Sequence, residues 1–153
     1  MDVPTVRRAT PDEAPVVARL LHDFNTEFAT PSPGAGVLAD RLRWLLAGPS
    51  TTAFLAGDPA VAVALVTARP NVWYPGPVLL LDELYVVPEL RGRGTGSAII
   101  ERLLAHAGEV GAGLVEINVD EGDVDTQRFY ARHGFTTSEP GSDERAFYYW
   151  REL

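Results

Sequence analysis

The most informative stretch of the sequence is Val86-Val87-Pro88-Glu89-Leu90-Arg91-Gly92-Arg93-Gly94-Thr95-Gly96-Ser97. An apolar strand stops there at a proline, and a glycine-rich turn leads into a helix expected from about Gly94 to Val110. The first N–H groups of a helix have no partner within it and carry a partial positive charge. Because glycines let a phosphate approach these donors closely, the stretch predicts a site for a phosphate-bearing ligand.

Two other phosphate-binding patterns fit this turn poorly. A P-loop requires Gly-Lys-Ser or Gly-Lys-Thr, and the sequence contains no lysine. A dinucleotide fingerprint would read Gly92-x-Gly94-x-x-Ser97, with serine where helix–strand packing requires glycine or alanine. The pattern that fits is Arg-x-x-Gly-x-Gly, formed by Arg91, Gly94 and Gly96.

This pattern resembles the coenzyme A pyrophosphate loop of the GNAT superfamily of N-acetyltransferases. A second segment, 127–135, contains Phe129-Tyr130 and Gly134-Phe135 and resembles the Phe-Tyr-x-x-x-Gly-Phe helix end of the same family. The order and separation of the two segments, which cover residues 79–136, also match. The resemblance implies acetyl-CoA, and hence coenzyme A, as the cofactor.

Composition narrows the function classes further. A chain of 153 residues is expected to form one domain, 1–153, with its own core. The absence of cysteine excludes disulfides, cysteine nucleophiles and thiolate metal sites. The net charge of −8 argues against a nucleic-acid partner and favours a cationic one, such as an amine. No apolar run reaches membrane-spanning length and no signal pattern begins the chain, so we expect a cytoplasmic protein with no membrane partner.

Hydrophobic spacing predicts an α/β fold. The expected strands are Val3–Ala9, Thr52–Ala56, Ala60–Ala68, Val78–Val87, Leu114–Val119, and a final pair from Phe135 onward that returns through Arg145–Arg151. The first expected helix begins after the Thr10 cap and ends near Phe28. Three more are expected over Val37–Ala47, Gly94–Val110 and Asp123–His133. This order, βααβββαβαββ, is the GNAT order, with a mixed central sheet of about seven strands flanked by four helices.

The coenzyme is expected to lie against main-chain groups. Amides opening the third helix would hold its diphosphate, with charge-assisted contacts from the arginines; the residues concerned are Arg91, Gly92, Arg93, Gly94, Thr95, Gly96 and Ser97. The preceding strand would bind the pantetheine arm through Leu84, Tyr85, Val86 and Val87, with N–H groups near Val86 as oxyanion donors. The resemblance adds that the family's fourth and fifth strands separate to admit this arm.

Tyr130 matches the tyrosine of the family's Phe-Tyr pair. The resemblance implies that Tyr130 is the acid that protonates the departing thiolate, while Phe129 suits packing. The sequence departs from the family six residues before this pair. There the family often has an asparagine that meets the coenzyme arm, whereas this chain has Asp123.

Asp82 and Glu83 are adjacent carboxylates within an apolar strand, where burial would raise a carboxyl pKa towards that of a useful base. Successive strand residues face opposite ways, so only one of them is expected to face the reacting amine. The resemblance favours Asp82, with Glu83 as the alternative. Arginine pairing of both carboxylates, or a water chain in place of a side-chain base, also fits.

By analogy with the family, the acceptor pocket would use the first two helices and the turn before the fourth strand. An aromatic wall with a carboxylate would suit a cationic amine; its members would be Phe24, Glu27, Phe28, Trp73 and Tyr74. His22, His106 and His133 lack metal or triad spacing and are interpreted as structural. No metal is expected, because the acidic loop 120–125 lacks the closing glutamate of a calcium loop.

These observations predict transfer of an acetyl group from acetyl-CoA to the primary amine of a small molecule, by direct attack in a ternary complex. The alternative is an acyl-CoA-binding sensor without catalytic activity, which would have no use for Tyr130. Many GNAT members pair, so the resemblance allows a homodimer. The acceptor itself is left open.

Overall fold

The computed structural model describes residues 2–153. Contacts divide the chain into two units, one ending at Ile117 and the other covering Asn118–Leu153. No helix among residues 2–153 combines the length and apolar character that a membrane crossing requires. The sequence prediction of a single domain stays a prediction.

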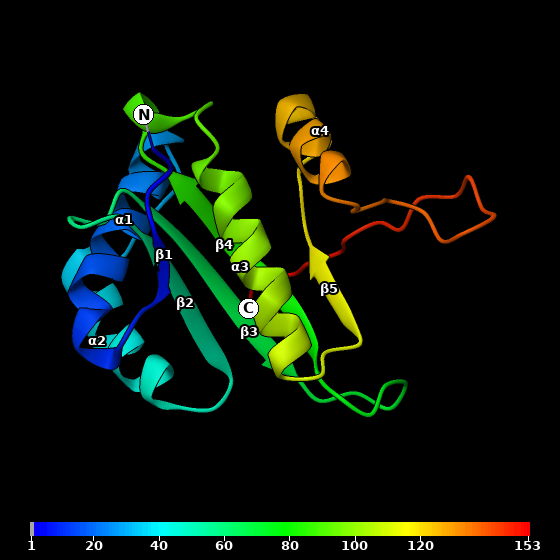
Figure 1. Cartoon of the computed structure of the whole chain (residues 1–153), viewed down its shortest axis with the longest axis horizontal. Coiled ribbons are helices and arrows are strands. Elements are labelled where there is room, and N and C mark those ends of the chain that lie inside the picture. The colour runs from blue at the N-terminus through cyan, green and yellow to red at the C-terminus, as the bar shows by residue number, and fades with distance from the viewer. Residues whose placement is uncertain (1) are drawn as a thin grey trace. The chain divides into compact units, whose positions relative to one another are not determined.

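The first unit is built on a five-stranded mixed sheet in the order β1-β2-β3-β4-β5 (Figure 1). Its strands are β1 (Val6–Arg8), β2 (Thr51–Ala56), β3 (Ala62–Arg69), β4 (Val78–Val86) and β5 (Leu114–Ile117). The first three pairings are antiparallel, and β5 pairs with β4 in parallel. The sheet is therefore mixed, as predicted.

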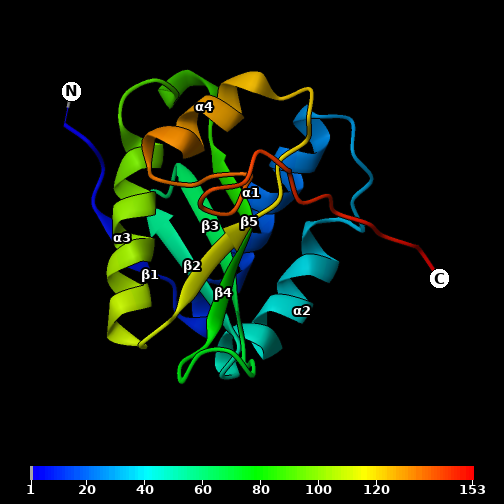
Figure 2. The same cartoon turned by 90° about the vertical axis from the view of Figure 1, so that its right-hand side faces the viewer.

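Helices cover both faces of this sheet (Figures 1 and 2). On one face lie α1 (Ala14–Glu27) and α2 (Ala35–Ala47), which bury Val17, Leu20 and Leu42 against sheet residues that include Leu55 and Val63. On the other face lies α3 (Thr95–Glu109), with Ile99, Ile100 and Leu103 fully buried. Both faces are apolar because each carries a helix layer.

The first helix begins as the sequence predicts. Thr10 precedes a short 3-10 turn, η1 (Pro11–Glu13), and the Glu13 carboxylate accepts a hydrogen bond from the Thr10 amide at 3.1 Å. The α-helical pattern starts only at Ala14. Pro15 fits there because the first-turn N–H groups of a helix have no intrahelical acceptor.

The second unit contains α4 (Val124–Arg132) and a long segment that follows it. The prediction of seven strands is wrong, because the described residues form five, and the order ends βαβα without the final strand pair. Only one bridge, Ser138 with Arg145, forms among the described residues of that segment. Phe147, Tyr148, Tyr149 and Trp150 are exposed. Aromatic residues favour strands by packing on a half-buried surface, so their spacing alone does not create one.

Candidate active site

The predicted anion site lies between the end of β4 and the start of α3. After β4 come a 3-10 turn, η2 (Pro88–Leu90), and two glycines with positive φ, Gly92 at 71° and Gly94 at 88°. Gly94 is the N-cap of α3, so the cap residue itself places no side chain in front of the first N–H groups of the helix. These donors, with the helix dipole behind them, can serve as a cradle for an anion at residues 91–97.

Near this cradle, one edge of β4 has no partner strand in the described part of the chain. Pairing with β5 ends at Leu81 and Ile117, while β4 continues to Val86. Within residues 2–153 no other strand pairs with β4 on that side. The main chain from Asp82 to Val86 can therefore accept an extended, amide-rich ligand in the manner of an added strand. The resemblance to the family implies an opening at this place.

A β-bulge in β4 corrects the prediction that Asp82 and Glu83 face opposite ways. Val66 of β3 pairs with Leu81 and Leu65 pairs with Glu83, so Asp82 is the extra residue. The Thr67 hydroxyl donates a hydrogen bond to Asp82 Oδ2 at 2.5 Å. Since Thr67 and Leu65 share one face of β3, both carboxylates lie on that same face.

This face is the one covered by α1 and α2. Leu65 packs against the core cluster that contains residues of both helices, and Tyr85 of β4 belongs to that cluster. Alternation from Glu83 to Tyr85 keeps the two side chains on the same side. The bulge therefore turns a pair of carboxylates towards the helices from which the acceptor pocket was predicted.

The electrostatic environment distinguishes the two carboxylates. Partial burial raises the pKa of Asp82, and the hydrogen bond from Thr67 acts in the opposite direction. Burial also raises the pKa of Glu83, and the negative charge of Asp82 raises it further. The charge of one carboxylate opposes ionisation of the other, so the pair holds a proton to higher pH than a lone carboxyl group, as a base for proton transfer requires.

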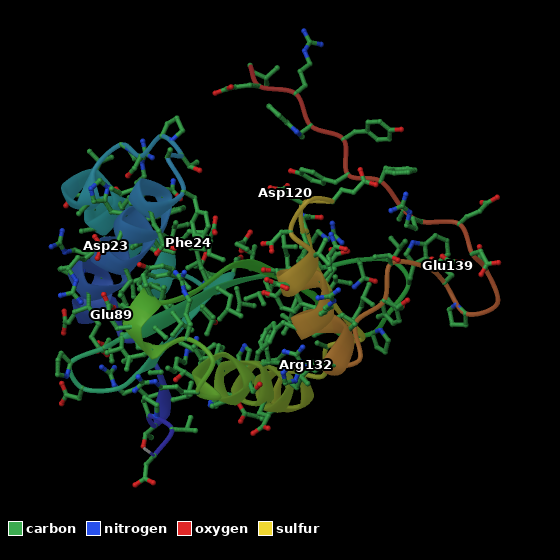
Figure 3. All side chains as sticks on the ribbon, turned by 90° about the horizontal axis from the view of Figure 1, so that it is seen from above. Asp23, Phe24, Glu89, Asp120, Arg132 and Glu139 are labelled. Atoms are coloured by element: carbon green, nitrogen blue, oxygen red, sulfur yellow. The ribbon has the colours of Figure 1, made fainter. Side chains whose placement is uncertain are left out.

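The end of α1 brings three predicted pocket residues to the same end of β4. The Phe24 ring stacks on Tyr85 with centroids 5.1 Å apart, and Phe28 lies 5.4 Å from Phe24. The Tyr85 hydroxyl donates to Glu27 at 3.3 Å. Figure 3 shows Phe24 on α1 and Glu89 of η2 at this end of the first unit.

Arg91 is held by α1 and by the end of β4. Its guanidinium donates to both carboxylate oxygens of Glu27, at 2.7 and 2.8 Å, and to the Val86 carbonyl at 2.9 Å. These bonds lower the pKa of Glu27 and raise that of Arg91. The Arg91 side chain therefore joins the cradle to α1, and its backbone N–H donates to the Pro88 carbonyl at 3.3 Å, so neither group supports the predicted contact of Arg91 with phosphate.

Trp73 and Tyr74 do not join this group. They lie in the loop before β4, at the other end of that strand from the cradle, where Asn71 Oδ1 accepts their backbone N–H groups at 2.9 and 2.8 Å. Tyr74 packs so closely on Gly113 that a Cβ there would lie 2.3 Å from its ring. Of the five predicted pocket residues, the structure gathers Phe24, Glu27 and Phe28.

The second unit carries the remaining predicted site residues. Tyr130 of α4 is 6% exposed, and its ring meets Phe129 and Phe135 edge-on at 5.1 and 5.6 Å. Asp123 is the N-cap of α4, where its carboxylate accepts the Thr126 N–H at 3.2 Å. Asp123 therefore has a structural role that the sequence reading did not assign to it.

Comparisons with known proteins agree on one family. The profile described as the acetyltransferase (GNAT) family matches residues 17–135. A curated relative from Archaeoglobus fulgidus, an uncharacterised N-acetyltransferase, is 30% identical over 103 residues, 65% of this chain and 69% of that protein. Another, from Mycobacterium bovis, is 38% identical over 55 residues, 36% of this chain. That match spans about a third (35%) of the Mycobacterium protein.

Solved structures extend the comparison to the whole chain. A crystal structure from Arthrobacter sp. FB24, assigned as an acetyltransferase, is 51% identical with a TM-score of 0.93 and covers 100% of this chain and 98% of that one. An aminoglycoside acetyltransferase from a soil metagenomic sample, solved in complex with sisomicin, is 19% identical with a TM-score of 0.78. It covers 97% of this chain and 95% of that one, and at this identity the likeness concerns the fold alone.

Proposed function

Because the chain belongs to the acetyltransferase (GNAT) family, we propose that it transfers the acetyl group of acetyl-CoA to the primary amine of a small cationic molecule. The observation that carries this proposal is the glycine-capped start of α3 directly beyond the open edge of β4. Donors for a diphosphate and a strand edge for an amide-rich arm follow each other along the chain, in the order in which coenzyme A presents these groups.

The residues of the cradle fit this co-substrate. A Cβ at Gly94 would lie 3.3 Å from Val3, and its φ of 88° is one that residues with a side chain rarely adopt. The diphosphate would lie on the N–H groups of residues 92–97, and the arm would bond to the main chain of residues 84–87. The Val86 N–H would face the carbonyl oxygen on which negative charge develops.

The chemistry requires a free amine and a protonated leaving group. The acceptor ammonium would lose one proton to the carboxylate pair of Asp82 and Glu83, and its nitrogen would then attack the thioester carbonyl carbon. The C–N bond forms and the C–S bond breaks. The second nitrogen proton passes to solvent as the amide forms, and the thiolate takes up one proton, which we assign to the Tyr130 hydroxyl. The resulting tyrosinate regains a proton from solvent. No acyl-enzyme is required.

A cationic acceptor suits the charges on the α1 side of β4. Asp82 and Glu83 are carboxylates on that face, and Phe24 and Phe28 add aromatic surface, whereas the charge of Glu27 is already paired with Arg91. Because the soil metagenomic neighbour was solved with sisomicin, aminoglycosides are sensible first acceptors to assay, together with linear polyamines.

The test measures thiol release from acetyl-CoA with a panel of amines, alongside the thermal protection that coenzyme A gives. We expect turnover with at least one cationic amine and protection of the native protein. In Gly94→Glu the added carboxylate would stand among the phosphates and abolish protection. Gly108→Glu is the matched control, since Gly108 lies near the other end of α3 with nothing within 4 Å.

Unchanged protection in Gly94→Glu would contradict the assignment of the cradle. Protection without turnover for any amine would instead support the acyl-CoA sensor. Turnover of acetyl-CoA with amines and loss of protection in Gly94→Glu alone would together establish the proposed reaction and its binding site.

A further inference from the structure

We propose that Thr67 is a positioning residue that divides the roles of the two carboxylates at the β4 bulge. Its hydroxyl holds Asp82 as the fixed anion that receives the acceptor ammonium, and Glu83 is the group that takes the proton. This inference rests on the proposed acetyl transfer and identifies which carboxylate is the base.

The geometry comes from the bulge and from one hydrogen bond. Asp82 is the extra residue between the pairs Val66–Leu81 and Leu65–Glu83, so it stands beside Glu83 instead of across the sheet from it. The Thr67 hydroxyl donates to Asp82 Oδ2 at 2.5 Å, the length of a strong bond to an ionised carboxylate. A hydrogen-bond donor that contacts only one of two adjacent carboxylates gives the two groups different affinities for a proton.

This inequality sets the order in which the two groups ionise. A hydrogen bond to the charged form favours that form, so Asp82 loses its proton first. Its charge then opposes ionisation of Glu83, which therefore holds its proton to higher pH. A base with a raised pKa takes a proton from an ammonium group more readily than one with an ordinary carboxyl pKa.

Two ion pairs lie on this side of the sheet. Arg69 of β3 and Glu116 of β5 lie on the same face and pair at 2.8 Å, and Glu27 of α1 pairs with Arg91. The other titratable groups towards this end of α1 are His22, whose ring bonds to Ser32, and Asp23. On the opposite face of the sheet, α3 contributes the buried His106 and, beside it, Glu109. The charge that acts on Glu83 is that of Asp82.

The proton balance follows from this division. The ammonium binds against ionised Asp82 and passes one proton to ionised Glu83, which leaves a neutral amine and a protonated Glu83. After acetyl transfer, Glu83 returns its proton to solvent. Both carboxylates must therefore be ionised in the free enzyme, and the acidic limb of kcat/KM reports the last proton to leave the pair.

Four variants test the assignment with one amine of high pKa used throughout. Thr67→Val removes the donor, and Thr67→Ser keeps it. Asp82→Asn removes the neighbouring charge, and Glu83→Gln removes the base. The pH dependence of kcat/KM is measured for each variant, and carboxyl carbon NMR titration of Asp82 and Glu83 gives a reading that does not depend on activity.

We expect the NMR titration of Asp82 to move to higher pH in Thr67→Val, because ionised Asp82 loses a stabilising bond, while the acidic limb, which reports Glu83 beside an already ionised Asp82, moves little. Thr67→Ser should restore the titration of Asp82. Asp82→Asn should move the limb to lower pH and raise KM for the amine. Glu83→Gln should lower kcat/KM about a hundredfold above the acidic limb and should remove that limb. By NMR, Glu83 should titrate above Asp82.

Three results would overturn the inference. An unmoved NMR titration of Asp82 in Thr67→Val, with lower activity at all pH values, would make Thr67 merely structural. Loss of activity in Asp82→Asn together with retention in Glu83→Gln would make Asp82 the base. Titration of Asp82 above Glu83 would reverse the order of ionisation. Absence of turnover in the native enzyme with every amine would contradict the proposed function instead, and the NMR titration would still judge the division of roles.

Discussion

His106 is a buried titratable residue outside the candidate site. It is 6% exposed in α3, and its ring meets Phe54 edge-on at 5.5 Å. Burial lowers its pKa from the ordinary 6.5, with Arg8 and Arg102 acting in the same direction and Glu109 in the opposite one. The folded protein therefore keeps the ring neutral at pH values where the unfolded chain takes up a proton.

We expect the free energy of unfolding to fall as the pH drops below about 6.5, because the unfolded state then binds more protons than the folded state. The fall ends where the folded ring itself becomes protonated. It amounts to about 1.4 kcal/mol for each pH unit by which the pKa is lowered. Urea unfolding between pH 8 and 5 should show this slope in the native protein and a smaller one in His106→Gln. Equal slopes would show that His106 does not contribute.

Single residues show how far the sequence could predict the site. The strand that carries the two carboxylates and the glycine turn that precedes the helix were predictable, because adjacent acids in an apolar strand and glycines before a helix are local patterns. The pairing of Arg91 with Glu27 was not, since 64 positions separate them and no local pattern links them. Thr67 was missed for the same reason. A threonine in a strand carries no signal until the register of the neighbouring strand is known.

At the scale of elements, the turn into α3 depends on the positive φ of Gly92. Gly92 and Gly108 both have open space around the position of a Cβ, but only Gly92 has a left-handed φ, 71°. We expect Gly92→Ala to destabilise the fold by about 1–2 kcal/mol through backbone strain. Gly108→Ala should stabilise it by up to about 1 kcal/mol, as alanine does in a helix. Melting temperatures measure both, and equal effects would contradict the strain argument.

The elements themselves were largely predictable, whereas the bulge was not. The helix expected from Gly94 to Val110 is found at Thr95–Glu109, and the strand expected over Val78–Val87 is found at Val78–Val86. Apolar spacing identifies such elements because it follows the repeat of each structure. One extra residue at Asp82 breaks the alternation of side chains, and it depends on pairing with β3 that the strand's own sequence does not reveal.

The C-terminal segment shows that a strand-like composition alone does not predict a strand. The segment after α4 has the aromatic composition of strands, yet its described residues form a single bridge. A strand requires a partner for its main chain, and whether one is offered depends on the assembled sheet. The number of strands therefore could not be read from the segment's own sequence, while the order of the preceding elements could.

The proposed acid and the cradle lie in different units, because Tyr130 belongs to the second unit and residues 91–97 to the first. Catalysis and coenzyme binding can therefore be changed separately. We expect Tyr130→Phe to lower kcat about ten- to a hundredfold, because the thiolate loses its proton donor. The dissociation constant of coenzyme A should change little, because the cradle binds it through main-chain donors. Tyr148→Phe is the control, since this exposed tyrosine also lies in the second unit. An unchanged kcat in Tyr130→Phe would leave Tyr130 as a packing residue beside Phe129 and Phe135.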